Sequence, residues 1–243
     1  MCLKNKKIKG WFMLVLGALF GISQPVYAVD VEDFILKETD KIAYLTFDDG
    51  PSIYTEKLVD ILNVHGVPGI FFVLGKQLDH IPDANRLLKR LADEGHHIAL
   101  HTMTHDKNAL YFSEKSPSLF KEEMLTLKNE IKLRTGHETN LCRAPYGKHG
   151  HFKIAHHKAV EDAGLYCVDW HVDSKDWAKK NASQIYDEVA RQLKDASDQD
   201  EIVLLFHEYQ RTVDALPAII ELLKAHGYGF EPYVEGKTFK GLD

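Results

Sequence analysis

The chain has 243 residues, of which 44% are hydrophobic and 27% are charged. This length can close one sizeable core but is too short for two ordinary domains with linkers. The net charge is −6, and the basic residues are scattered outside one N-terminal cluster, so we expect no nucleic acid partner.

The N-terminal segment has the pattern of an export signal. Four lysines between positions 4 and 9 precede an apolar run over residues 11–22, and small residues near Ala28 match a signal-peptidase site. An uncleaved membrane anchor is the alternative, but about 12 apolar residues are few for a bilayer of about 30 Å. We therefore predict a signal peptide over residues 1–28 and a single domain over 29–243. The mature protein would be periplasmic or extracellular, with no stable membrane insertion.

After residue 41, short β-branched or aromatic runs alternate with longer helical patterns, which indicates βα units around a largely parallel sheet. The predicted strands cover residues 42–47, 69–74, 97–100, 140–143, 166–169, 202–206 and 229–234. The predicted helices cover residues 54–65, 83–94, 117–135, 152–163, 183–195 and 213–226. Several of these helices stop at a glycine. About seven parallel strands predict an α/β fold, an irregular or incomplete (β/α) barrel, with an open doubly wound sheet as the alternative.

The cysteines are too few for a disulfide framework. Cys2 falls in the predicted signal, which leaves Cys142 and Cys167 in the mature chain. Both lie in predicted strands, so we interpret them as buried thiols, with one bridge between neighbouring strands as the alternative.

Titratable residues gather directly after the predicted strands, where α/β folds place their active sites. Asp48 and Asp49 follow the first strand at a sharp Gly-Pro turn, although a solvated turn with a helix N-cap would use the same residues. His101 and His105, after the third strand, would face the same side of a helical turn. With one carboxylate they would form the two-His, one-carboxylate set of a catalytic zinc site. The second carboxylate would then be free to act as a base.

Later strands end in further polar residues. Arg143 follows the fourth strand and could hold a catalytic carboxylate in its ionised form, or make an ordinary surface salt bridge. Asp176 and His207 follow the fifth and sixth strands, and such a pair suggests a general acid. Trp177, taken alone, would be a packing residue.

Five segments, TFDDGPS, HTMTH, RAPYG, DSKDW and LLFH, occur in this order at predicted strand ends. In order and chemistry they resemble the polysaccharide deacetylases, also called NodB-homology domains or carbohydrate esterase family four. The resemblance covers about residues 40–231. It implies a hydrolase that removes the N-acetyl group of N-acetylglucosamine residues in a polysaccharide and releases acetate. It also implies Zn²⁺, or another divalent transition metal such as Co²⁺, as cofactor.

The resemblance assigns the metal ligands and the base. It implies that Asp49, His101 and His105 bind the metal. It implies further that Asp48 is the catalytic base and that Arg143 tethers it.

The resemblance also assigns the acid and the acetyl pocket. His207 would be the general acid, oriented by Asp176. Trp177 and Leu205 would wall the pocket for the acetyl methyl group. Tyr146 would offer its backbone N–H to the oxyanion.

Some residues depart from the family pattern or lie outside it. His97 stands where many relatives carry an acidic residue, and Glu208 follows His207 where aspartate is common. Neither change removes a catalytic atom. We interpret four further histidines, at 149, 151, 156 and 157, as mostly a solvated loop and helix face, with a secondary metal site as the alternative.

Several acetylated polymers are candidate substrates. Export favours peptidoglycan, and chitin or its oligosaccharides, poly-N-acetylglucosamine and acetylated xylan are the alternatives. A carbohydrate-binding protein with a dead site belongs to another class, and the intact set of candidate metal, base and acid residues argues against it. A magnesium-dependent phosphoryl-transfer enzyme would leave both histidines of HTMTH without a role.

Overall fold

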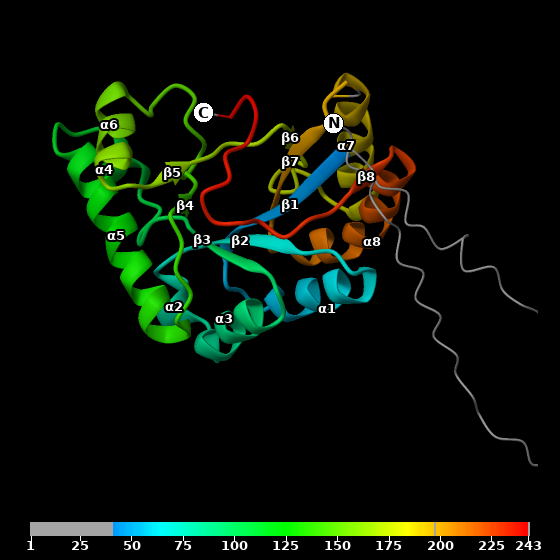
Figure 1. Cartoon of the computed structure of the whole chain (residues 1–243), viewed down its shortest axis with the longest axis horizontal. Helices are drawn as coiled ribbons and strands as arrows, with labels where there is room; N and C mark the ends of the chain where they lie inside the picture. Colours follow the sequence, from blue (N-terminus) through cyan, green and yellow to red (C-terminus); the bar gives the residue numbers. More distant parts are fainter. Residues whose placement is uncertain (1–40, 197, 243) are drawn as a thin grey trace, which may run out of the picture. The chain divides into compact units, whose positions relative to one another are not determined.

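A curved parallel sheet carries the fold in the computed structural model, which describes residues 41–196 and 198–242 (Figure 1). The predicted signal peptide lies outside these residues. The strands follow the order β5-β4-β3-β2-β1-β7-β6, every pair is parallel, and the short β8 pairs with the start of β1. Their bounds are β1 (Lys41–Gly50), β2 (Gly69–Val73), β3 (His97–Leu100), β4 (Leu141–Cys142), β5 (Tyr166–Cys167), β6 (Val172–Asp173), β7 (Glu201–His207) and β8 (Tyr228–Gly229).

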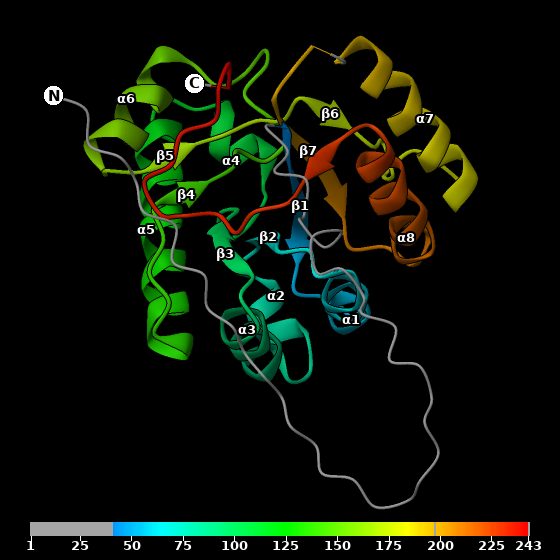
Figure 2. The same ribbon diagram turned by 45° about the vertical axis from the view of Figure 1, so that its right-hand side comes forward.

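The larger helices alternate with the strands along the chain and cover the outer side of the sheet (Figure 2). Several end at a left-handed glycine, such as Gly66 after the first helix. The helices are α1 (Thr55–His65), α2 (Gln77–His80), α3 (Ala84–Asp93), α4 (Lys107–Tyr111), α5 (Ser116–Thr135), α6 (Ile154–Asp162), α7 (Ala182–Asp195) and α8 (Gln210–Ala225).

The alternation of side chains along β1 builds two hydrophobic layers. Phe47 faces the helices and stacks on Phe71 and Phe206, with ring centroids 4.9 and 5.7 Å away. Tyr44 points to the other, inner face, where it meets Phe239 of the C-terminal segment. Because successive residues of a strand point to opposite faces, both layers form from one continuous apolar run.

The barrel is incomplete, as predicted. The edge strands β5 and β6 are consecutive in the chain, and in the described part no ladder joins them; residues 168–171 connect them covalently. The irregular segment over residues 230–242 lies against the inner face of the sheet instead of forming the predicted strand 229–234. The strand β8 overlaps that prediction only at Gly229. The strand β6 and the short helices α2 and α4 were not predicted.

Two predictions about single residues have clear outcomes in the structure. Cys142 and Cys167 are free and buried, and they lie opposite each other on β4 and β5. His156 does not lie on a solvated helix face: it is fully buried, and its Nε2 atom lies 2.9 Å from the carbonyl of Leu110. Its Nδ1 atom accepts from the backbone N–H of Lys153, so backbone groups satisfy both ring nitrogens in the core.

Within residues 41–196 and 198–242, none of the helices is both long and apolar enough to span a membrane. All of these residues belong to one compact unit.

Candidate metal centre and active site

The end of β1 brings two adjacent carboxylates to one side of the sheet. Asp48 pairs with Phe72 of β2, but Gly50 pairs with the next residue, Val73, so Asp49 is bulged out of the ladder. Its backbone is left-handed, with φ of 69°. In a regular strand the two side chains would point to opposite faces, and the bulge re-aims Asp49. Both carboxylates consequently approach His101, with Nε2 3.8 Å from Asp48 Oδ2 and 3.6 Å from Asp49 Oδ1.

Asp49, His101 and His105 have the donor set of a transition-metal site. One ligand atom from each lies within 4.8 Å of the others. Asp49 Oδ1 is 3.5 Å from His105 Nε2, and although buried it has no hydrogen-bond partner among the described residues. A buried carboxylate oxygen that faces two imidazole nitrogens without a donor is satisfied by a cation. The residues therefore fit a bound metal ion.

In each histidine, Nε2 approaches Asp49 and Nδ1 contacts another group that orients the ring. His101 Nδ1 lies 2.9 Å from the carbonyl oxygen of Arg143, so it donates there and leaves Nε2 free. Burial lowers the pKa of His101 to about 3, which keeps the ring in the neutral form that binds metals. His105 Nδ1 lies 3.1 Å from the hydroxyl of Tyr146, and that hydroxyl donates to the carbonyl of His105.

The two histidines do not share a helical turn, contrary to the sequence-based expectation. Residues 101–105 form an irregular loop in which Thr102 and His105 have left-handed backbones, with φ of 66° and 59°. The loop still brings the rings together, with centroids 5.2 Å apart. Non-glycine residues with positive φ are strained and tend to occur at functional sites.

Asp48 is buried against a fully buried arginine. Arg143 Nη1 donates to Asp48 Oδ1 at 2.8 Å and to Thr46 Oγ1 at 2.7 Å. Its other donors reach two backbone carbonyls, and its guanidinium lies 4.0 Å from the centre of the Phe72 ring. Burial raises the pKa of Asp48, and the charge of Arg143 opposes this rise. The carboxylate is thus fixed in position with a pKa above its ordinary value.

His207 lies directly across the ladder from Asp48, because these two residues are partners in the β1–β7 register. Its Nδ1 is 2.7 Å from Oδ1 of the fully buried Asp176, whose Oδ2 accepts from the backbone N–H of His207 and from Thr212. Burial lowers the pKa of His207, but the hydrogen bond and charge of Asp176 outweigh burial and raise it to about 9. The imidazole is therefore protonated at neutral pH.

These groups open into one cavity of about 460 Å³, which we call the acetyl-side cavity. Trp177 is 57% exposed and Leu205 is buried, and both line it together with the candidate metal ligands. Tyr146, with φ of 66°, also lines the cavity. The arrangement places a buried carboxylate, a cationic imidazole and a candidate metal centre around one volume large enough for a small ligand group.

Comparison with known proteins identifies the family. The family model described as polysaccharide deacetylase matches residues 36–168. The chain belongs to this family. A peptidoglycan-N-acetylglucosamine deacetylase of Bacillus cereus is 35% identical over 82% of this chain and 71% of its own length. A chitooligosaccharide deacetylase of a Bradyrhizobium strain is 33% identical over 78% of this chain and 87% of its own length.

The fold agrees with this membership. The crystal structure of the polysaccharide deacetylase Bc1974 from Bacillus cereus matches with a TM-score of 0.74 and 32% identity, covering 83% of this chain and 96% of that chain. The incomplete barrel of this deacetylase is therefore the fold of its family.

The structure brings every predicted site residue of this deacetylase to the same end of the sheet. Asp48 and Asp49 come from β1, and His101 and His105 follow β3. The remaining residues follow β4 and β6 or lie at the end of β7. The predicted set meets in or directly behind the acetyl-side cavity: Asp48, Asp49, His101, His105, Arg143, Tyr146, Asp176, Trp177, Leu205 and His207.

Besides Ala144 and Gly147 of the RAPYG segment, three further residues that line this cavity were not assigned a role from the sequence. Trp170 lies between β5 and β6, Asp173 ends β6, and Tyr209 follows His207 by two positions. All three stand near strand ends, so the rule that located the other site residues could have found them. The sequence also contained no sign that the hydroxyl of Tyr146 contacts His105, because only the folded loop brings the two residues together.

Proposed function

We propose that this polysaccharide deacetylase is metal-dependent and exported, and that it hydrolyses the N-acetyl group of N-acetylglucosamine residues in peptidoglycan. The observation that carries the metal dependence is the unpartnered, buried Oδ1 of Asp49 between two imidazole nitrogens. The relatives named as peptidoglycan deacetylases support the polymer. Export rests on the pattern of residues 1–28, followed by a single domain over residues 29–243.

Asp49, His101 and His105 would hold the metal, with Zn²⁺ as the first choice and Co²⁺ as a substitute. When bound, the ion supplies Lewis-acid polarisation of the acetamide carbonyl and acidifies the attacking water. The rest of the reaction depends on side chains and backbone groups of this chain.

Asp48 would take the proton of the attacking water. Arg143 holds its carboxylate in place, while burial gives it more basicity than an exposed aspartate has. As the water oxygen bonds to the carbonyl carbon, the backbone N–H of Tyr146 would stabilise the negative oxygen. Trp177 and Leu205 would enclose the methyl group and exclude solvent.

His207 would then donate its proton to the sugar nitrogen as the C–N bond breaks, which releases acetate and a glucosamine residue. Base and acid need opposite protonation states at the same pH. Asp176 raises the pKa of His207 to about 9, so this acid stays protonated below that pH. The charge of Arg143 opposes protonation of the base, Asp48.

The decisive experiment follows acetate release and metal content together. A chelator should abolish acetate release, and zinc or cobalt should restore it. His101→Ala and His105→Ala should lose bound metal, whereas Asp48→Asn should retain it and lose turnover by roughly 10² to 10⁴-fold. His157→Ala, on the exposed side of α6, is the matched control and should change neither quantity.

Full activity after verified metal removal would refute the metal dependence, and equal metal loss in all three site variants would make Asp48 a ligand. The same acetate assay, run on peptidoglycan, chitin oligosaccharides and acetylated xylan, tests the polymer. If acetate release is greater from chitin oligosaccharides or acetylated xylan, that polymer is the substrate and peptidoglycan is not.

A further inference from the structure

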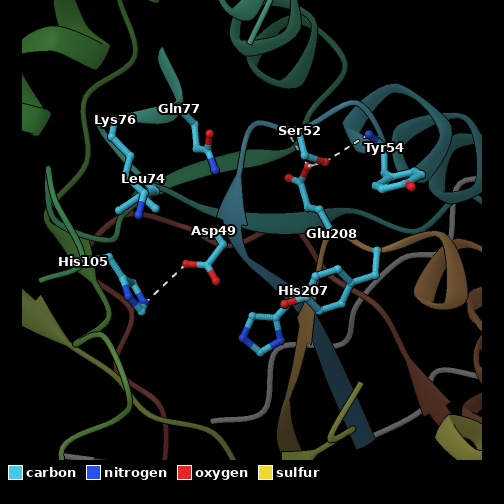
Figure 3. A pocket seen from close by; sticks show the side chains of 10 residues that line it. Asp49, Ser52, Tyr54, Leu74, Lys76, Gln77, His105, His207 and Glu208 are labelled. Carbon is cyan, nitrogen blue, oxygen red and sulfur yellow. Dashed lines mark hydrogen bonds and ion pairs between the residues drawn. The ribbon is translucent and has the colours of Figure 1, made fainter. Parts of the chain in front are cut away.

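A second cavity, of about 330 Å³, adjoins the acetyl-side cavity across Asp49, His105 and His207, which line both (Figure 3). Its own walls include Tyr54, Leu74, Lys76 and Gln77, and we call it the lysine lobe. Figure 3 shows Lys76 and Gln77 on one side of Asp49, with Ser52, Tyr54 and Glu208 on the other. The reaction described above uses no residue that belongs to this lobe alone.

The backbone that carries Lys76 is fixed to the loop that carries His105. Gly75 donates to the carbonyl of Thr102 at 2.9 Å, and Lys76 donates to that of Met103 at 2.8 Å. A Cβ atom on Gly75 would lie 2.8 Å from the Cα atom of Met103, so only glycine permits this approach. Lys76 is therefore held beside the candidate metal ligands by backbone contacts rather than by its side chain.

The side chain of Lys76 is exposed. Within the described ranges, no acceptor or carboxylate pairs with its Nζ atom, and the amide of Gln77 is likewise unpaired. Lys76 lines the lobe together with Asp49 and His105, so its positive charge lies near the candidate metal ligands. A positive charge here repels a metal cation. An anionic group on the ligand would offset that repulsion.

The aromatic walls of the lobe suit a sugar ring. Tyr209 lines both cavities, and its ring lies under the guanidinium of Arg211, 4.0 Å from the ring centre, and beside the ring of His207 at 5.8 Å. A third cavity, of about 570 Å³, shares Tyr54 and Tyr209 with the lobe and leads to the start of α7. Tyr54, Leu74 and Tyr209 supply apolar surface among polar lining residues, a mixture found in ligand sites, and cavities that share lining residues suit a chain of linked sugars.

We propose that the lysine lobe binds the sugar next to the one being deacetylated, and that Lys76 pairs with a carboxylate substituent on that neighbouring sugar. This inference rests on the proposed function and refines its substrate class. Glycan strands of peptidoglycan alternate an N-acetylglucosamine with a sugar that carries a carboxylate-bearing lactyl ether, whereas chitin is neutral throughout. Lys76 would thus favour acidic over neutral N-acetylated chains.

The test compares two tetrasaccharides of equal length. One consists of N-acetylglucosamine alone, and the other alternates it with lactyl-ether sugars whose carboxylates are free. Lys76→Gln should lower kcat/KM for the acidic chain by about threefold to tenfold, the effect of losing one partly exposed ion pair, and leave the neutral chain unchanged. Lys76→Arg should retain the preference, and conversion of the carboxylates to amides should remove it in the native protein.

Lys107→Gln is the matched control, because Lys107 lies over the ring of Tyr146, 5.0 Å from its centre, and does not line the lobe. It should leave the ratio between the two chains unchanged. Bound metal is measured in every variant. Equal loss on both chains after Lys76→Gln, or no loss on either, would overturn the proposal.

Binding separates this proposal from the proposed function. Calorimetry with the Asp48→Asn protein measures the affinity for both tetrasaccharides, because a binding measurement needs no turnover. If the native protein releases no acetate from either chain, the proposed function fails, while a Lys76-dependent affinity for the acidic chain would still support the lobe. Equal affinities for the two chains would refute the proposed role of the lysine lobe, even if the protein is an active deacetylase.

Discussion

At the scale of single residues, the pairing of His207 with Asp176 determines how the rate should depend on pH. The pKa of His207 is about 9 because Asp176 more than offsets burial. An acid must enter the reaction protonated, so kcat/KM should fall as the pH rises through that pKa. Asp176→Asn removes the stabilising charge and should move this alkaline limb to lower pH. The measurement is a profile of kcat/KM against pH, with zinc content determined in parallel.

His207→Ala tests the same role without reference to pH. Turnover of an N-acetyl substrate should fall by roughly 10² to 10⁴-fold, whereas an acetyl ester with a good leaving group should lose much less. Equal losses on both substrates, or an alkaline limb that stays in place after Asp176→Asn, would show that His207 is not the proton donor.

Tyr146 connects the third and fourth strand ends through its hydroxyl, which contacts both Nδ1 and the carbonyl of His105. Tyr146→Phe keeps the backbone N–H but removes this contact, so His105 loses the group that orients its ring. We expect metal affinity to weaken by about tenfold, the lower end of the range for partners of metal ligands. Competition with a chromophoric chelator measures it, and Tyr111→Phe, whose hydroxyl donates to the carbonyl of Pro145, is the control. Unchanged affinity would limit Tyr146 to its backbone role.

The adjacent pair Asp48-Asp49 shows what a sequence can and cannot reveal about single residues. Residue type and position after a strand were enough to select both as site candidates. Regular strand geometry, however, would direct them to opposite faces, and only the bulge at Asp49 directs both toward His101. Nothing in the residue types predicts that bulge without the neighbouring strand.

At the scale of elements, Glu208 joins the end of β7 to the start of α1. Its Oε2 accepts from the backbone and hydroxyl of Ser52, at 3.0 and 2.7 Å, and from the hydroxyl of Thr55. Burial raises the pKa of Glu208 to about 7. A Cβ atom on Gly50 would lie 2.0 Å from Oε1, so the close approach of these two elements depends on glycine at that position.

Gly50→Ala should therefore displace Glu208 and break its hydrogen bonds. We expect a loss of about 1–3 kcal/mol in the free energy of unfolding, the usual cost of overpacking. Glu208→Ala removes the obstructing atom, so adding Gly50→Ala to that variant should cost far less. Urea unfolding of the two single variants and the double variant gives the coupling energy. If the losses of the two single variants add up to the loss of the double variant, Glu208 does not restrict the side chain at position 50.

Elements with a long apolar pattern were predictable from the sequence, and short ones were not. The helix over residues 54–65 ends in the structure at Gly66, whose left-handed backbone stops it as expected. By contrast, β6 has two residues and α2 has four, too few to express a periodicity. The strand β6 forms because it pairs with β7 at Leu204 and Leu205.

At the scale of the whole described chain, parallel strands explain why the site could be located without a structure. All carboxyl ends of a parallel sheet meet at one edge, so residues that follow different strands converge. The candidate metal, base and acid residues obey this rule. The filling of the inner face does not follow from it, because residues 230–242 have no regular structure and their aromatic residues have no period that predicts which face they cover.

Phe239 belongs to that inner layer and is 1% exposed. Its ring meets the edge of Tyr44 at 5.0 Å and stacks with Tyr233 at 5.7 Å, while its backbone N–H donates to the hydroxyl of Tyr166. Phe239→Ala would leave a cavity in the layer that covers the inner face of the sheet, and no further strand is available to fill it. The expected loss is about 3–5 kcal/mol in the free energy of unfolding.

The comparison that isolates this effect uses Lys240→Ala, whose exposed side chain adjoins Phe239 in sequence and should cost less than about 0.5 kcal/mol. Both variants are measured by urea unfolding, with bound metal recorded in the folded state. Because Tyr44 and Tyr233 lie away from the acetyl-side cavity, the folded Phe239→Ala protein should keep its metal. A stability loss as small as that of Lys240→Ala would mean that the sheet and its outer helices stabilise the barrel without the C-terminal segment.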